Sequence, residues 1–116
     1  MKAYLAASVT LVFLASVAAT PPRAGQDIVD HGTASGAPAC ISCHGSTLQG
    51  NPAMKAPPLA GKPSAYILAR LAHYAGPAGH NAMMKQVATA LRPDQRTAVA
   101  AYIATLPPTA AAAPGR

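Results

Sequence analysis

Apolar residues recur at helical spacing in four stretches of the chain, and no stretch alternates for long as a half-buried strand would. The clearest stretch lies near the C-terminus. Its apolar positions follow one another at i, i+3, i+4 and i+7, namely Val99, Tyr102, Ile103 and Leu106. Pro93 suits the first turn of such a helix, and two further prolines follow Leu106. The pattern predicts a helix over about 93–106.

Three shorter helices are predicted upstream. One begins near Pro63 and runs to about residue 75, with Ile67 and Leu71 on its apolar face. The others cover about 24–32 and 83–90. Long segments rich in glycine and proline separate them. The predicted fold class is therefore all-α, with about four short helices joined by long loops.

The N-terminal segment has a different composition. Lys2 precedes an uncharged apolar run over about 5–19, and a polar stretch with prolines follows. This is the layout of a secretory signal. An uncleaved anchor is the alternative, but the run is short for a span of about 20 residues. We expect a signal peptide over 1–19, removed on export, and no stable membrane span in what remains.

The rest of the chain divides into one domain and a tail. We expect the domain to cover 20–108 and the alanine-rich tail, 109–116, to be disordered. The domain is poor in large side chains, because the chain has no tryptophan and its one phenylalanine lies in the expected signal. Small domains of this kind often need a covalent cross-link or a bound metal for stability. The composition indicates that something other than side chains fills the core.

The chain is basic, with a formal net charge of +6 and no glutamate. Its lysines and arginines are scattered singly and do not interleave with aromatic residues, which excludes a nucleic-acid-binding stripe. A basic surface can instead steer a protein toward an acidic partner.

The motif Cys40-Ile-Ser-Cys43-His44 carries the chemistry of the sequence. A redox-active cysteine pair would need a βαβ setting, which the pattern lacks. A structural zinc site would need four ligands, and there is no second cysteine pair. A plain disulfide is a further alternative. Covalent haem attachment is favoured, because C-x-x-C-H places two thiols for thioether bonds and a histidine directly beside them.

A haem iron has a second axial position. Electron carriers usually fill it with methionine or histidine. Met83 and Met84 lie well downstream of the motif and are the candidates. Met54 lies only ten residues past His44 in a loop, and we expect it to pack near the haem edge instead.

Three segments together resemble the class I c-type cytochromes, the small bacterial monohaem type in particular, over most of 24–107. These are ACISCHG (39–45), APPLAGKPSAYIL (56–68) and NAMMKQVATALRPDQRTAVAAYIATL (81–106). The first resembles the haem-attachment segment. The second resembles the loop that leads into a helix on the haem, and the third resembles the distal methionine loop with the last helix. The resemblance implies the cytochrome c fold, wrapped around one covalently attached haem.

The resemblance also implies residue roles. Cys40 and Cys43 would carry the thioethers of one haem c, and His44 would be the proximal iron ligand. The carbonyl of Pro57 would accept a hydrogen bond from the proximal imidazole. Met84, seven residues before Leu91, would be the distal iron ligand, with Met83 as runner-up. The remaining haem-binding residues would line the pocket: Leu59, Tyr66, Leu71 and Leu91.

The sequence departs from the family pattern at three places. Arg92 stands where a hydroxyl or acidic residue usually caps the last helix. The first helix offers only Ile28 and Val29 to pack against Tyr102 and Ile103, so we expect a weak junction there. His80 lies where relatives often carry arginine; there it could compete for the iron, although we expect an exposed loop histidine. His31 and His73 are expected to be exposed as well.

The predicted function is electron transfer. We expect a periplasmic protein, not an enzyme, that carries one electron on a His/Met-ligated haem c. Its partners would be redox proteins with an acidic docking face, such as a periplasmic dehydrogenase or a terminal oxidase, and not nucleic acid. The alternative is a haem protein with a labile sixth ligand that binds small molecules or turns over peroxide.

Overall fold

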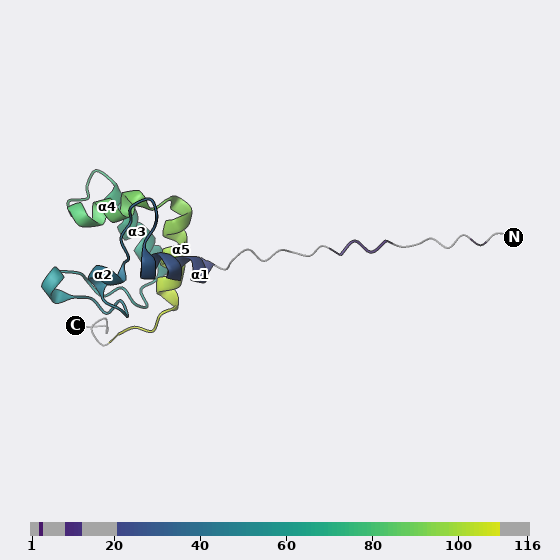
Figure 1. Ribbon diagram of the computed structural model, residues 1–116, viewed down its shortest axis with the longest axis horizontal. Helices are drawn as coiled ribbons and strands as arrows, with labels where there is room; N and C mark the ends of the chain where they lie inside the picture. Colours follow the sequence, from purple (N-terminus) through teal and green to yellow (C-terminus); the bar gives the residue numbers. More distant parts are fainter. Residues whose placement is uncertain (1–2, 4–8, 13–20, 110–116) are drawn as a thin grey trace.

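Five α-helices and one 3-10 turn make up the described part of the computed structural model, which covers residues 3, 9–12 and 21–109 (Figure 1). In chain order they are α1 (Pro21–His31), α2 (Ile41–His44), η1 (Pro52–Met54), α3 (Ser64–Ala75), α4 (Ala82–Ala90) and α5 (Pro93–Thr105). Within these residues the only strand-like pairing is one bridge between Asn51 and Ala56. The all-α class is confirmed.

Most of the predicted signal peptide and all of the predicted tail beyond Thr109 lie outside the described residues. The boundaries of the signal, the domain and the tail therefore stay predictions. None of the described helices is both long and apolar enough to pass through a bilayer.

The four periodic patterns correspond to α1, α3, α4 and α5, with small differences at their ends. α1 begins at Pro21, three residues before the predicted start, because proline fits a first helical turn. Pro63 precedes α3 as its N-cap and is not the first helical residue. α2 and η1 span four and three residues, too few for an apolar period to show, so the pattern missed both.

The helices pack around one core. α1 crosses α5, and α3 packs against both α4 and α5, while α2 and α4 lie on the same side of α5 (Figure 1). The largest fully buried side chains come from α1, α5 and one loop: Val29, Val99, Ile103 and Leu48. Ile28 and Tyr102 are partly buried against the same core.

Gly25 sets the distance between α1 and α5. A Cβ atom at this position would overlap the carbonyl oxygen of Ala98 and lie 2.8 Å from Cβ of Tyr102. The missing side chain lets the two backbones approach each other. The junction that we expected to be weak is therefore closely packed, with close backbone approach in place of an aromatic contact.

The start of α5 is capped despite Arg92. The side-chain carbonyl of Gln95 accepts a hydrogen bond from the backbone N–H of Arg92, at 2.9 Å. The guanidinium of Arg92 also pairs with Asp94 at 3.1 Å, and its hydrogen bond lowers the pKa of that carboxyl. Both side chains of the pair are exposed, so the pair adds little stability.

We expect Gly25→Ala to destabilise the haem-loaded protein. Alanine favours a helix by up to about 1 kcal/mol over glycine, but overpacking against a fixed backbone costs about 1–3 kcal/mol. The added methyl meets the backbone of Ala98, which cannot move aside, so the cost should reach the upper end of that range, about 3 kcal/mol, and the net loss about 2 kcal/mol. The measurement is the free energy of unfolding in denaturant.

Gly76→Ala is the matched control. Its Cβ would lie 3.3 Å from the nearest atom, the carbonyl oxygen of Ala72. This variant should stay within about 0.5 kcal/mol of the parent. A Gly25→Ala protein as stable as the parent would contradict the close crossing of α1 and α5.

Candidate functional site

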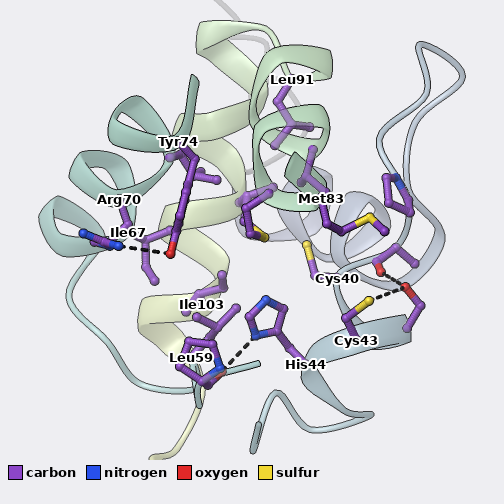
Figure 2. Close-up of a pocket in the computed structure, with 18 of the residues that line it drawn as sticks. Cys40, Cys43, His44, Leu59, Ile67, Arg70, Tyr74, Met83, Leu91 and Ile103 are labelled. Atoms are coloured by element: carbon purple, nitrogen blue, oxygen red, sulfur yellow. Dashed lines mark hydrogen bonds between the residues drawn. The ribbon is translucent and has the colours of Figure 1, made fainter. Parts of the chain in front are cut away.

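One apolar pocket lies between α2, the loop at 57–59, α3, α4 and α5 (Figure 2). It holds about 860 Å³ of space, including its opening to solvent. All the predicted haem-binding residues line it: Cys40, Cys43, His44, Pro57, Leu59, Tyr66, Leu71, Met84 and Leu91. The lining also includes four core residues that were not predicted there: Ile67, Val87, Val99 and Ile103.

His44 ends the single turn of α2 and is the one buried polar residue among the described residues. Its Nδ1–H donates a hydrogen bond of 2.8 Å to the carbonyl oxygen of Pro57. Because a carbonyl can only accept, this bond places the ring proton on Nδ1. Nε2 is then left with a lone pair, and Figure 2 shows the ring reaching from α2 toward the middle of the pocket. This is the arrangement of an imidazole prepared to bind a metal ion.

The backbone around Leu48 holds Pro57 beside His44. The carbonyl of Leu48 accepts hydrogen bonds from Leu59 and Ala60, at 2.9 and 3.2 Å. Just before the loop, the carbonyl of His44 accepts from Gly50 at 2.8 Å. Leu48 is 1% exposed and has a φ of 55°, an unusual conformation for leucine, which its burial maintains. No apolar period marked this residue in advance.

Cys40 and Cys43 stand at one wall of the pocket, partly buried and not bonded to each other. Burial raises the pKa of the Cys40 thiol to about 11. The thiolate is the reactive form, so this thiol is not the attacking nucleophile of a redox-exchange pair. Among the described residues no three histidine, cysteine or acidic side chains gather around a point that could hold a metal ion, so zinc finds no support there either.

Both candidate methionines lie in the first turn of α4 and line the pocket. Asn81 caps this helix, since its side-chain oxygen accepts a hydrogen bond of 3.0 Å from the backbone N–H of Met84. Met84 is partly buried against the core, whereas Met83 is 55% exposed. Figure 2 shows Met83 and Leu91 on the side of the pocket away from His44. Met54, in η1, is 53% exposed and does not line the pocket, so its expected place near the haem edge stays a prediction.

The wall formed by α3 carries a charge that was not predicted from the sequence. Arg70 is the one permanently charged side chain in the lining. Its Nη2–H donates to the hydroxyl of Tyr74 at 3.0 Å, and its guanidinium carbon lies 4.9 Å from the centre of that ring. Figure 2 shows Arg70 and Tyr74 across the pocket from Cys40 and Cys43. An arginine spaced evenly with tyrosines at i−4 and i+4 was the available signal.

The lining residues fit a haem c. A haem carries vinyl groups on one side of its ring and two carboxylates on the other, and the pocket has thiols on one side and a guanidinium opposite. The space between them is walled by apolar side chains, with a buried imidazole pointing in. The other three histidines, His31, His73 and His80, are exposed and do not line the pocket.

Comparison with known proteins agrees with this geometry. The family model described as cytochrome c matches residues 23–107. A curated relative from Thiomonas intermedia, named "Thiosulfate dehydrogenase electron acceptor", is 39% identical over 100 residues, which cover 86% of this chain and 40% of the relative.

Two solved structures are also similar. Cytochrome c4 of Acidithiobacillus ferrooxidans matches with a TM-score of 0.69 and 33% identity, over 74% of this chain and 50% of that one. Thiosulfate dehydrogenase of Marichromatium purpuratum matches with a TM-score of 0.73 and 30% identity, over 76% of this chain and 19% of that one. The chain thus spans half or less of the length of these relatives.

Proposed function

The chain belongs to the cytochrome c family, and from this membership we propose that it is a periplasmic carrier that takes single electrons from a dehydrogenase. Membership makes it an electron-transfer protein with one haem c bound through Cys40 and Cys43. The observation that carries the proposal is the buried imidazole of His44. It directly follows the thiols, and its tautomer leaves Nε2 free to bind iron.

The ligand set we propose is His44 with Met84. The carbonyl of Pro57 orients the imidazole and makes it a stronger base, as second-shell acceptors of ligating histidines do. Met84 is favoured over Met83 because its side chain is partly buried against the core, while that of Met83 is largely exposed. A His/Met pair raises the reduction potential. The apolar walls exclude water and also set the potential.

Arg70 would hold the acidic edge of the cofactor. A guanidinium forms its strongest hydrogen bonds with carboxylates. Tyr74 fixes the guanidinium of Arg70 at the wall opposite the cysteines. We therefore assign Arg70 to a haem carboxylate. Haem supplies the one-electron chemistry, while these residues bind it, orient it and keep water out.

The relatives suggest the class of partner. The chain resembles proteins named as electron acceptors of thiosulfate dehydrogenase, and it also resembles part of a thiosulfate dehydrogenase. We propose that its electron donor is a dehydrogenase of the same kind, which oxidises a reduced sulfur anion. A terminal oxidase would be a suitable acceptor downstream.

The distribution of charge along the chain supports a proposal for the docking face. Four cations and no acidic residue lie in 52–91, the part that carries the Pro57 loop, α3 and α4: Lys55, Lys62, Arg70 and Lys85. Two of the three acidic residues of the chain, Asp27 and Asp30, lie in α1 instead. Positive charge is thus concentrated on segments that form the pocket. We propose that the surface formed by these segments, 52–91, is the docking face and that it binds an acidic surface of the partner.

Met84→Ala should remove the methionine–iron charge-transfer band from the visible spectrum of the oxidised protein, because it deletes the proposed distal ligand. Met83→Ala is the matched control and should keep the band. A parent protein that is already high-spin would refute methionine ligation and favour the alternative of a haem with an open site. Loss of the band only in Met83→Ala would reassign the ligand.

Removing charge from the proposed docking face should slow electron transfer. We expect Lys62→Gln with Lys85→Gln to reduce the second-order rate of reduction by thiosulfate dehydrogenase about fivefold at low salt, and less at high salt. Arg23→Gln with Arg92→Gln, in α1 and at the start of α5, removes the same charge elsewhere and is the control. Equal slowing by both pairs would show that net charge matters and that the face does not.

A further inference from the structure

Side chains from outside the short helix α4 form hydrogen bonds with both of its ends. It spans nine residues, too few for a stable helix in isolation. Asn81 caps its N-terminus. At its C-terminus the hydroxyl of Ser35 donates to the carbonyl of Ala90 at 2.9 Å, and Arg96 of α5 reaches across to the carbonyl of Ala88. The position of α4 therefore depends on contacts outside the helix.

Arg96 makes the strongest of these contacts. Its Nε–H and Nη2–H both donate to the carbonyl oxygen of Ala88, at 3.1 and 2.7 Å, in a partly buried setting. Ala88 is fully buried, and the only other hydrogen bond this carbonyl accepts at the end of α4 is a long one of 3.4 Å from Leu91. Without Arg96 the carbonyl would keep only that weak partner, which is costly for a buried acceptor.

Ala88 connects this contact to the proposed distal ligand. Residues i and i+4 lie on the same face of a helix, so Ala88 lies one turn beyond Met84 on α4. Ala88 is buried in the core, and Met84 is packed against that core. Val87, one residue before Ala88, and Leu91, directly after α4, line the same pocket as Met84. A shift at the C-terminal end of α4 would therefore move Met84 relative to the pocket.

We propose that Arg96 is a positioning residue for the distal iron ligand. Its two hydrogen bonds to Ala88 would keep α4 in the position that lets the thioether of Met84 bind the iron. The inference rests on the proposed ligation by Met84. A small molecule that competes with Met84 for ferric iron should bind more tightly once Arg96 is removed, because the methionine is then less well placed.

Arg92 provides a matched comparison. It stands four residues earlier, at the start of α5, and pairs only with the exposed Asp94 and not with α4. Arg96→Gln and Arg92→Gln therefore make the same change in charge and volume. Only the first removes a contact with α4.

The experiment uses the full-length, haem-loaded protein in its oxidised form. Imidazole is titrated into the parent, Arg96→Gln and Arg92→Gln, and its affinity is read from the loss of the methionine–iron band. Arg96→Gln should bind imidazole about tenfold more tightly, the usual size of a second-shell effect. Arg92→Gln should match the parent within about twofold. Arg96→Lys, which keeps one donor, should fall between.

Unfolding in denaturant separates positioning from simple stability. If Arg96→Gln is less stable but binds imidazole like Arg92→Gln, Arg96 is structural and the proposal is wrong. If Arg96→Gln does not fold, the milder Arg96→Lys carries the test: it should bind imidazole a few-fold more tightly than the parent, and parent-like binding would overturn the proposal. A parent without the methionine band overturns the ligand assignment, and this inference with it, whereas an intact band with no Arg96 effect overturns this inference alone.

Discussion

The hydrogen bond from His44 to the carbonyl of Pro57 is the constraint on which the site depends. It fixes the ring proton on Nδ1 and leaves Nε2 facing the pocket. To make it, the chain must bring a loop back beside the one-turn helix that carries the cysteines. The carbonyl of Leu48 holds that loop through hydrogen bonds from Leu59 and Ala60. The buried side chain of Leu48 keeps the backbone of this residue in an uncommon conformation. The loop between His44 and α3 contains only the 3-10 turn η1, and its backbone hydrogen bonds to Leu48 and His44 place this carbonyl.

The rest of the fold supports that arrangement with small side chains and short helices. Alanines and a glycine let α1 and α5 approach closely, so the chain needs no tryptophan in its core. The apolar faces of α3, α4 and α5 pack against one another and also line the pocket. A covalently bound haem c in that pocket completes the core and accounts for the thin supply of large side chains. The contacts that line the pocket therefore serve both the stability of the fold and electron transfer.

The sequence predicted what depends on local pattern and on motif. Apolar periodicity located the four longer helices, and the Cys40–His44 motif with the Pro57 loop located the pocket. It did not predict features that depend on two segments meeting in space. Gly25 reads as an ordinary helical glycine until Ala98 lies beside it. Arg96 reads as a surface residue until the carbonyl of Ala88 is near.

The proton NMR spectrum of the reduced protein tests the central claim, that His44 and a methionine hold the iron of a carrier, most directly. The ring current of the haem shifts protons that lie over the iron far upfield. Ligation by His44 and a methionine predicts one strongly upfield-shifted methionine methyl signal, together with a slowly exchanging ring N–H from His44 bonded to Pro57. A spectrum without an upfield methyl signal would contradict methionine ligation. It would point to a haem with an open coordination position and a function other than simple electron transfer.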